Sequence, residues 1–110
     1  MNDAAEVRFL AYEQVSREWA QAQANYEQLD EFRKAKKAML MQQAEFNGKT
    51  SAAIQERDAY ASKDYRDFLD TIKTAQELAL GLKQQLKAME MRFEWSRTLQ
   101  ATRRAEMNLR

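Results

Sequence analysis

The chain has 110 residues, with 18 Lys and Arg against 17 Asp and Glu and a formal net charge of +1. It contains no Pro, Cys or His and only two Gly. So few turn-forming residues exclude β-sandwiches, barrels and doubly wound sheets, which need many turns. Without Cys and His, disulfides and the usual zinc and haem ligands are absent. We expect no enzymatic activity, no cofactor, no metal site and no catalytic residue.

The first predicted element is a long helix over residues 4–46. Asp3 with Glu6 three residues later matches a capping box at its start. Apolar residues then follow the alternating spacing of three and four that marks a coiled-coil seam: Tyr12, Val15, Trp19, Ala22, Tyr26 and Leu29. The apolar row next shifts to Phe32, Ala35 and Met39. This shift predicts a stammer, which overwinds or bends a coiled coil.

A turn is predicted at residues 47–51 and nowhere else. Gly48 suits the left-handed position just beyond a helix, and Thr50 or Ser51 can cap the helix that follows. The run Gly48-Lys49-Thr50 lacks the first glycine and the preceding strand of a phosphate-binding loop, so nucleotide binding is not expected.

The second predicted helix spans residues 52–108 without a break, because a lone Gly81 costs only about 1 kcal/mol. Its seam holds ten positions at the same spacing: Ala61, Tyr65, Phe68, Ile72, Ala75, Ala79, Leu82, Leu86, Met89 and Phe93. We therefore predict an all-α fold, a long antiparallel coiled-coil-like hairpin forming a single domain over residues 1–110. The second helix outruns the first beyond about Phe93.

Charge is distributed in blocks along the chain. Bases gather at residues 33–37, and acids gather in the stretch that the hairpin would place opposite, at Glu56, Asp58, Asp64 and Asp67. Complementary flanks that set the register of the two helices are the simpler interpretation, and a nucleic-acid footprint is the alternative. The acids Asp64, Asp67 and Asp70 lack the turn glycine of a calcium loop and are interpreted as a solvated face.

The C-terminal stretch has the composition of a binding surface. It carries five arginines and no lysine around one tryptophan, and arginine suits phosphate and stacking contacts. We predict that nucleic acid or an acidic protein binds Arg92, Trp95, Arg97, Arg103, Arg104 and Arg110. The competing interpretation is that Asp3 and Glu6, of the same or a neighbouring chain, neutralise these arginines.

Apolar residues off the seam predict self-association, most simply a dimer that forms a helical bundle. They are Phe32, Met39, Met91, Trp95 and Leu99, and a hairpin alone would leave them in water. No signal peptide is recognisable in residues 1–10, and no apolar run approaches the ~20 residues of a membrane span. We expect an intracellular protein that does not enter a membrane.

Two groups of motifs resemble a known family. Gly48-Lys49-Thr50, Glu56-Arg57, Ala59-Tyr60-Ala61-Ser62 and Tyr65 form the first, and Glu94-Trp95-Ser96-Arg97 with Arg103-Arg104 the second. Together they resemble small, mostly uncharacterised phage-encoded proteins, over residues 45–105. This family tends to carry an acid where Ala53 stands, and to keep adjacent the tryptophan and arginine that Ser96 separates here.

The resemblance implies a gene neighbourhood of recombination and single-strand annealing functions, and hence the cytoplasm of a bacterial host cell. It supplies no catalytic residue. Two hypotheses follow: an accessory protein of phage DNA recombination or replication that binds DNA or a DNA-processing protein, or a purely structural oligomeric coiled coil that acts as adaptor or chaperone.

Overall fold

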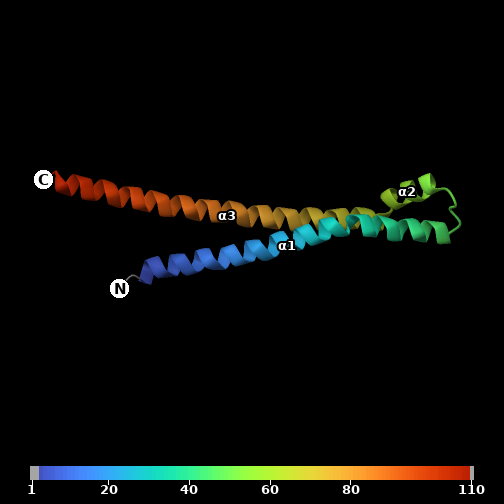
Figure 1. The fold of residues 1–110 in the computed structure, drawn as a ribbon, viewed down its shortest axis with the longest axis horizontal. Coiled ribbons are helices and arrows are strands. Elements are labelled where there is room, and N and C mark those ends of the chain that lie inside the picture. The colour runs from blue at the N-terminus through green and yellow to red at the C-terminus, as the bar shows by residue number, and fades with distance from the viewer. Residues whose placement is uncertain (1–2, 110) are drawn as a thin grey trace. The chain divides into compact units, whose positions relative to one another are not determined.

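The computed structural model describes residues 3–109, which form three α-helices and no strand (Figure 1). Helix α1 spans Asp3–Phe46, α2 spans Ala52–Ala61 and α3 spans Lys63–Asn108. The predicted all-α helical hairpin is confirmed, and α1 begins one residue earlier than expected. Within this part of the chain no helix combines the length and hydropathy needed to cross a membrane.

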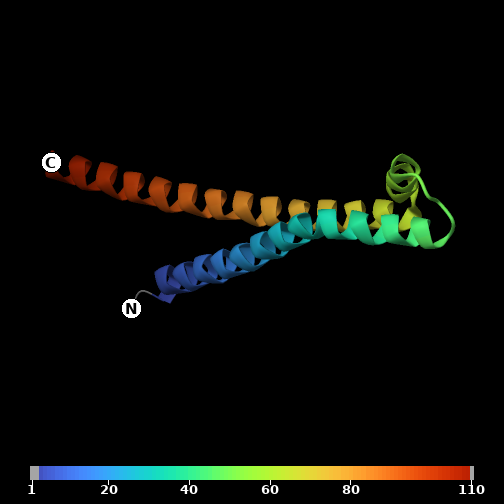
Figure 2. The ribbon, with the colours of Figure 1, turned by 45° about the vertical axis from the view of Figure 1, so that its right-hand side comes forward.

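The described residues fall into two compact units. The terminal unit joins the residues up to Trp19 with those from Leu80 onward, and the turn unit comprises Ala20–Ala79. In each unit a part of α1 lies antiparallel to a part of α3, as both ribbon views show (Figures 1 and 2). Helix α2 belongs to the turn unit alone.

The predicted turn is present at residues 47–51 and has the hydrogen bonds of a Schellman motif. Gly48 adopts the left-handed φ of 95°. Its N–H donates to the Glu45 carbonyl, and the Lys49 N–H donates to the Ala44 carbonyl, each at 3.0 Å. These two bonds satisfy carbonyls that the end of α1 would otherwise leave free. Ser51 precedes α2 in extended backbone, but its side chain makes no capping bond.

The prediction of one continuous helix over residues 52–108 is wrong, because the chain breaks at Ser62. This residue is extended, with φ −68° and ψ 148°. Its Oγ donates to the Ala59 carbonyl at 2.7 Å and accepts the Tyr65 N–H at 3.1 Å. Ser62 thus closes α2 and caps α3 with one hydroxyl. Beyond it the helix runs through Gly81, as predicted.

Most of the predicted seam of α3 is confirmed. In the turn unit Tyr65, Ile72, Ala75 and Ala79 are buried, and in the terminal unit Leu86 is buried. Ala61 is exposed. It precedes the break at Ser62 and therefore does not share the face of α3 that meets α1.

The predicted stammer in α1 is wrong. Phe32, Ala35 and Met39 are exposed, whereas Leu40 is buried in a cluster with Ala59 and Tyr65. Leu40 lies about three full turns beyond Leu29, so the buried row keeps its original register. Ala59 of α2 is one of the residues that bury Leu40.

Candidate interaction surface

In the terminal unit, the last contact described between α3 and α1 involves Tyr12 of α1. The Tyr12 hydroxyl donates to Glu90 Oε1 at 2.7 Å, and the Tyr12 ring meets Phe93 edge to face, with centroids 5.8 Å apart. The bond to Glu90 raises the pKa of Tyr12 above its ordinary value. Beyond this contact Ser96 is half-buried, and every residue over 97–109 is exposed. We call residues 92–109 the C-terminal segment.

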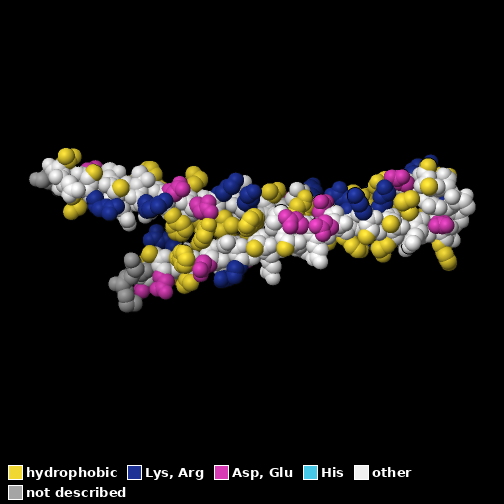
Figure 3. Space-filling view, viewed as in Figure 1, with side chains coloured by type: hydrophobic (Ala, Val, Ile, Leu, Met, Phe, Trp, Pro, Cys, Tyr) yellow, Lys and Arg dark blue, Asp and Glu magenta, His cyan; other side chains and the backbone are white. Residues whose placement is uncertain are grey.

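Four of the predicted arginines lie exposed on this segment: Arg92, Arg97, Arg103 and Arg104. The fifth, Arg110, lies outside the described residues. At 100° per residue, Arg97 and Arg104 lie on the same side of α3 as Phe93. Arg92 and Arg103 lie about 80–100° round the helix from Phe93. Figure 3 shows dark blue basic side chains standing out along this part of α3. The segment therefore presents cationic groups to solvent.

These arginines have no acidic partner within the described residues. The ion pairs of residues 3–109 involve Arg33 with Asp30, Lys37 with Glu56 and Arg57 with Asp58. Two residues of α1, Arg8 and Ala11, border a hollow together with Arg92, and neither is acidic. Asp3 and Glu6 are exposed and form no ion pair with the segment over these residues. Neutralisation within one chain, the competing interpretation, therefore finds no support.

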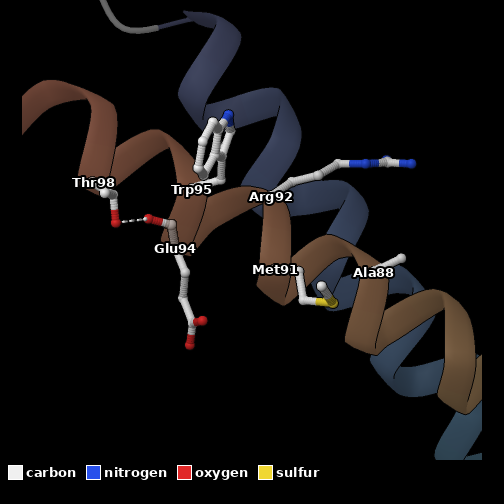
Figure 4. Close-up of a pocket in the computed structure, with 6 residues that line it drawn as sticks. All are labelled: Ala88, Met91, Arg92, Glu94, Trp95 and Thr98. Carbon is white, nitrogen blue, oxygen red and sulfur yellow. Dashed lines mark hydrogen bonds between the residues drawn. The ribbon is translucent and has the colours of Figure 1, made fainter.

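An apolar stripe formed by Met91, Trp95 and Leu99 lies on the face of α3 turned away from Phe93. Met91 is 69% exposed, Trp95 64% and Leu99 39%. Met91 and Trp95 border an open hollow that α3 alone forms, lined by Ala88, Met91, Arg92, Glu94, Trp95 and Thr98 (Figure 4). The Thr98 hydroxyl donates to the Glu94 carbonyl at 3.0 Å, so its polar atom is turned toward the helix backbone. The predicted interface residues of this unit thus share one unpartnered face.

The other two predicted interface residues, Phe32 and Met39, belong to the turn unit. Met39 is exposed, as expected. Phe32 is 47% exposed, but its ring meets Phe68 of α3 edge to face with centroids 6.0 Å apart. Phe32 therefore contributes part of its surface to the contact between α1 and α3.

A polar cluster that the sequence did not predict in detail joins α1 to α2. Lys37 Nζ lies 2.9 Å from Glu56 Oε1 and 5.0 Å from the centre of the Tyr60 ring. Tyr60 and Glu56 together raise the pKa of Lys37, and Lys37 lowers the pKa of Glu56. The expected pairing of basic and acidic blocks is realised at this point. Arg33, in the same basic block, pairs with Asp30 of its own helix.

The fold and its exposed segment define a class: an all-α helical hairpin whose last helix ends in an uncovered, arginine-bearing surface. Comparisons with protein-family models, with curated proteins and with solved structures found no match to this chain. Over residues 3–109 no cluster of acidic side chains is arranged to hold a metal ion.

Proposed function

We propose that this chain is a non-enzymatic accessory protein of phage DNA recombination or replication, and that its C-terminal segment binds DNA. The observation that carries the proposal is the set of exposed arginines, Arg92, Arg97, Arg103 and Arg104, which form no ion pair over the described residues. The resemblance to phage-encoded proteins supplies the biological setting. An acidic DNA-processing protein is the other partner that such a surface suits.

Arginine chemistry supports a polyanionic partner. A guanidinium stays charged at all physiological pH values and offers two parallel donors to a phosphate. Arg97 and Arg104 lie seven residues apart, about 10 Å along the helix. This spacing allows contacts with more than one phosphate along a strand. Contacts of this kind release counterions, which makes the affinity depend on salt.

The test is DNA binding measured by fluorescence anisotropy over a series of salt concentrations, with single- and double-stranded probes. We expect the triple variant R97A/R103A/R104A to bind more weakly. The slope of log affinity against log salt should fall by about 2–3 for three lost phosphate contacts. Alanine preserves the helix, since it is the strongest helix former.

The matched control is K73A/K83A/K87A, which removes three exposed cations from the same helix. Both triple variants change the net charge equally, so a general electrostatic effect would weaken them alike. Equal weakening, or no salt-dependent binding by the unmodified chain, would contradict the DNA proposal.

The unpartnered apolar stripe favours a second candidate, a purely structural oligomeric adaptor. Deletion of residues 97–110 separates the two. If the segment binds DNA, the shortened chain loses binding and keeps the helicity and melting temperature of its remaining residues. If the remaining residues unfold, or if the shortened chain still binds DNA, the segment is structural.

A further inference from the structure

The apolar stripe has the spacing of a second coiled-coil seam. Trp95 lies 200° around α3 from Phe93, and Phe93 contacts Tyr12 of α1, so the stripe faces away from α1. Inner positions recur at steps of three and four to the end of the described chain: Ala88, Met91, Trp95, Thr98, Thr102, Ala105 and Leu109. A seam of this kind has the geometry to receive another helix.

We propose that a second copy of the chain covers this stripe, with the two α3 segments antiparallel and centred on Leu99. The flanking charges select this arrangement. In an antiparallel pair, residues on the same flank of the two helices face each other. Centring on Leu99 places Arg92 of each copy beside Glu106 of the other. The pairing therefore contains two interchain pairs of opposite charge.

Other arrangements bring like charges together or form no pair of opposite charge. In a parallel, in-register pair, Lys87 of each copy would flank Arg92 of the other, because these positions lie five residues apart on opposite flanks. Sliding one helix by one heptad would place Arg92 opposite Leu99 and form no pair of opposite charge, and sliding it by two heptads, which centres the pair near Phe93, would place Arg92 beside Arg92 and Glu94 beside Glu94. Like charges at such positions destabilise helix pairs. Complementary charge thus distinguishes the register centred on Leu99.

Side-chain size agrees with the same register. Trp95, the largest inner residue of the stripe, faces Ala105 of the second copy. Leu99 lies on the flank that carries Arg92 and Glu106, beside its own equivalent near the two-fold axis. Large residues opposite small ones interdigitate well. Ala105 and Leu109 of the second copy fall at the level of the hollow beside Met91 and Trp95. That hollow is where their side chains would insert.

The pairing is compatible with the rest of the terminal unit. The contact of Tyr12 with Phe93 and Glu90 keeps α1 on the other side of α3. Arg97 and Arg104 lie toward that side too, so they stay exposed in the pair. The inference does not depend on DNA binding, and its test contains no nucleic acid.

The test is a charge swap followed by sedimentation equilibrium on the purified chain. R92E and E106R should each raise the dimer dissociation constant about tenfold, because each single change places like charges together twice. The double variant R92E/E106R should return to within about threefold of the unmodified chain. K83E, which makes the same charge change outside the paired segment, is the control and should have no effect. Circular dichroism verifies that each variant keeps its helicity.

Crosslinking gives an independent measurement of the register. The chain has no cysteine, so single-cysteine variants can be read unambiguously. L99C should form covalent dimers with a short bismaleimide, whereas Q100C, which lies 100° further round the helix on the side of Phe93, should not. Three results would each overturn the proposal. The chain could be a monomer at 100 μM, or the double variant could fail to recover. R92E could also associate more tightly, which is the result that a parallel pair predicts.

Discussion

Ser62→Ala tests the feature that interrupts the second half of the hairpin. The Ser62 hydroxyl makes two hydrogen bonds, one to the Ala59 carbonyl at 2.7 Å and one from the Tyr65 N–H at 3.1 Å. Loss of an N-cap side chain costs about 1 kcal/mol, and loss of a second hydrogen bond adds about 0.5–1.5 kcal/mol. We expect the free energy of unfolding to fall by about 1.5–2.5 kcal/mol, which lowers the melting temperature by several degrees.

Ser51→Ala is the matched control for this measurement. Ser51 occupies the equivalent position before α2, but its side chain makes no capping bond. Thermal unfolding followed by circular dichroism should therefore show little change for S51A, a clear loss for S62A and recovery for S62T, which retains a hydroxyl. If S62A melts with or above the unmodified chain, the hydroxyl does not hold the break, and alanine has joined α2 to α3.

Three further changes probe the fold. Leu40→Ala should cost about 2–3 kcal/mol in urea unfolding, because Leu40 is buried, whereas the exposed neighbour Met39→Ala should stay within about 0.5 kcal/mol; equal effects would contradict the assigned register. Gly81→Ala should stabilise the chain by about 1 kcal/mol, since an added Cβ meets no atom within 4 Å, and destabilisation would reveal an unrecognised contact. Lys37 lowers the pKa of Glu56, so their pair stabilises the fold above the ordinary carboxyl value of 4.5 and loses this effect as the pH falls through the lowered value. Glu56→Gln should flatten the acid side of a plot of melting temperature against pH, and an unchanged plot would exclude the pair as its source.

The sequence predicts the helical class, the turn and the main seam because each has a local physical cause. Glycine at Gly48 favours the left-handed backbone, and the spacing of three and four fixes which face of each long helix is buried. The break at Ser62 has a weaker local signal. A serine fits a helix interior tolerably, and its capping role depends on a choice between two hydrogen-bond patterns. The signal that could have indicated it is Ser62 preceding the acid-bearing first turn of α3.

The wrong prediction of a stammer rests on the apolar row of α1 alone. Phe32, Ala35 and Met39 follow Leu29 at steps of three and four, so they read as a shifted seam, although Leu40 continues the original one. Helix α2 changes which residues are available for burial, since Ala59 packs against Leu40. This contact between Leu40 and Ala59 lies outside what the spacing of α1 alone could indicate. The exposure of the C-terminal arginines was accessible from the sequence, because the longer second helix leaves them beyond the end of the first.

The exposed end of α3 has a thermodynamic consequence. A short helix without tertiary contacts is only marginally stable in water, so the order of residues 97–109 depends on intrinsic propensity and on local bonds such as that from Thr102 to the Thr98 carbonyl. The binding free energy of any partner that requires this stretch to be helical must offset the conformational entropy lost when the stretch is ordered. Side chains that touch no partner can therefore set the affinity, through the fraction of time that the helix exists before the encounter.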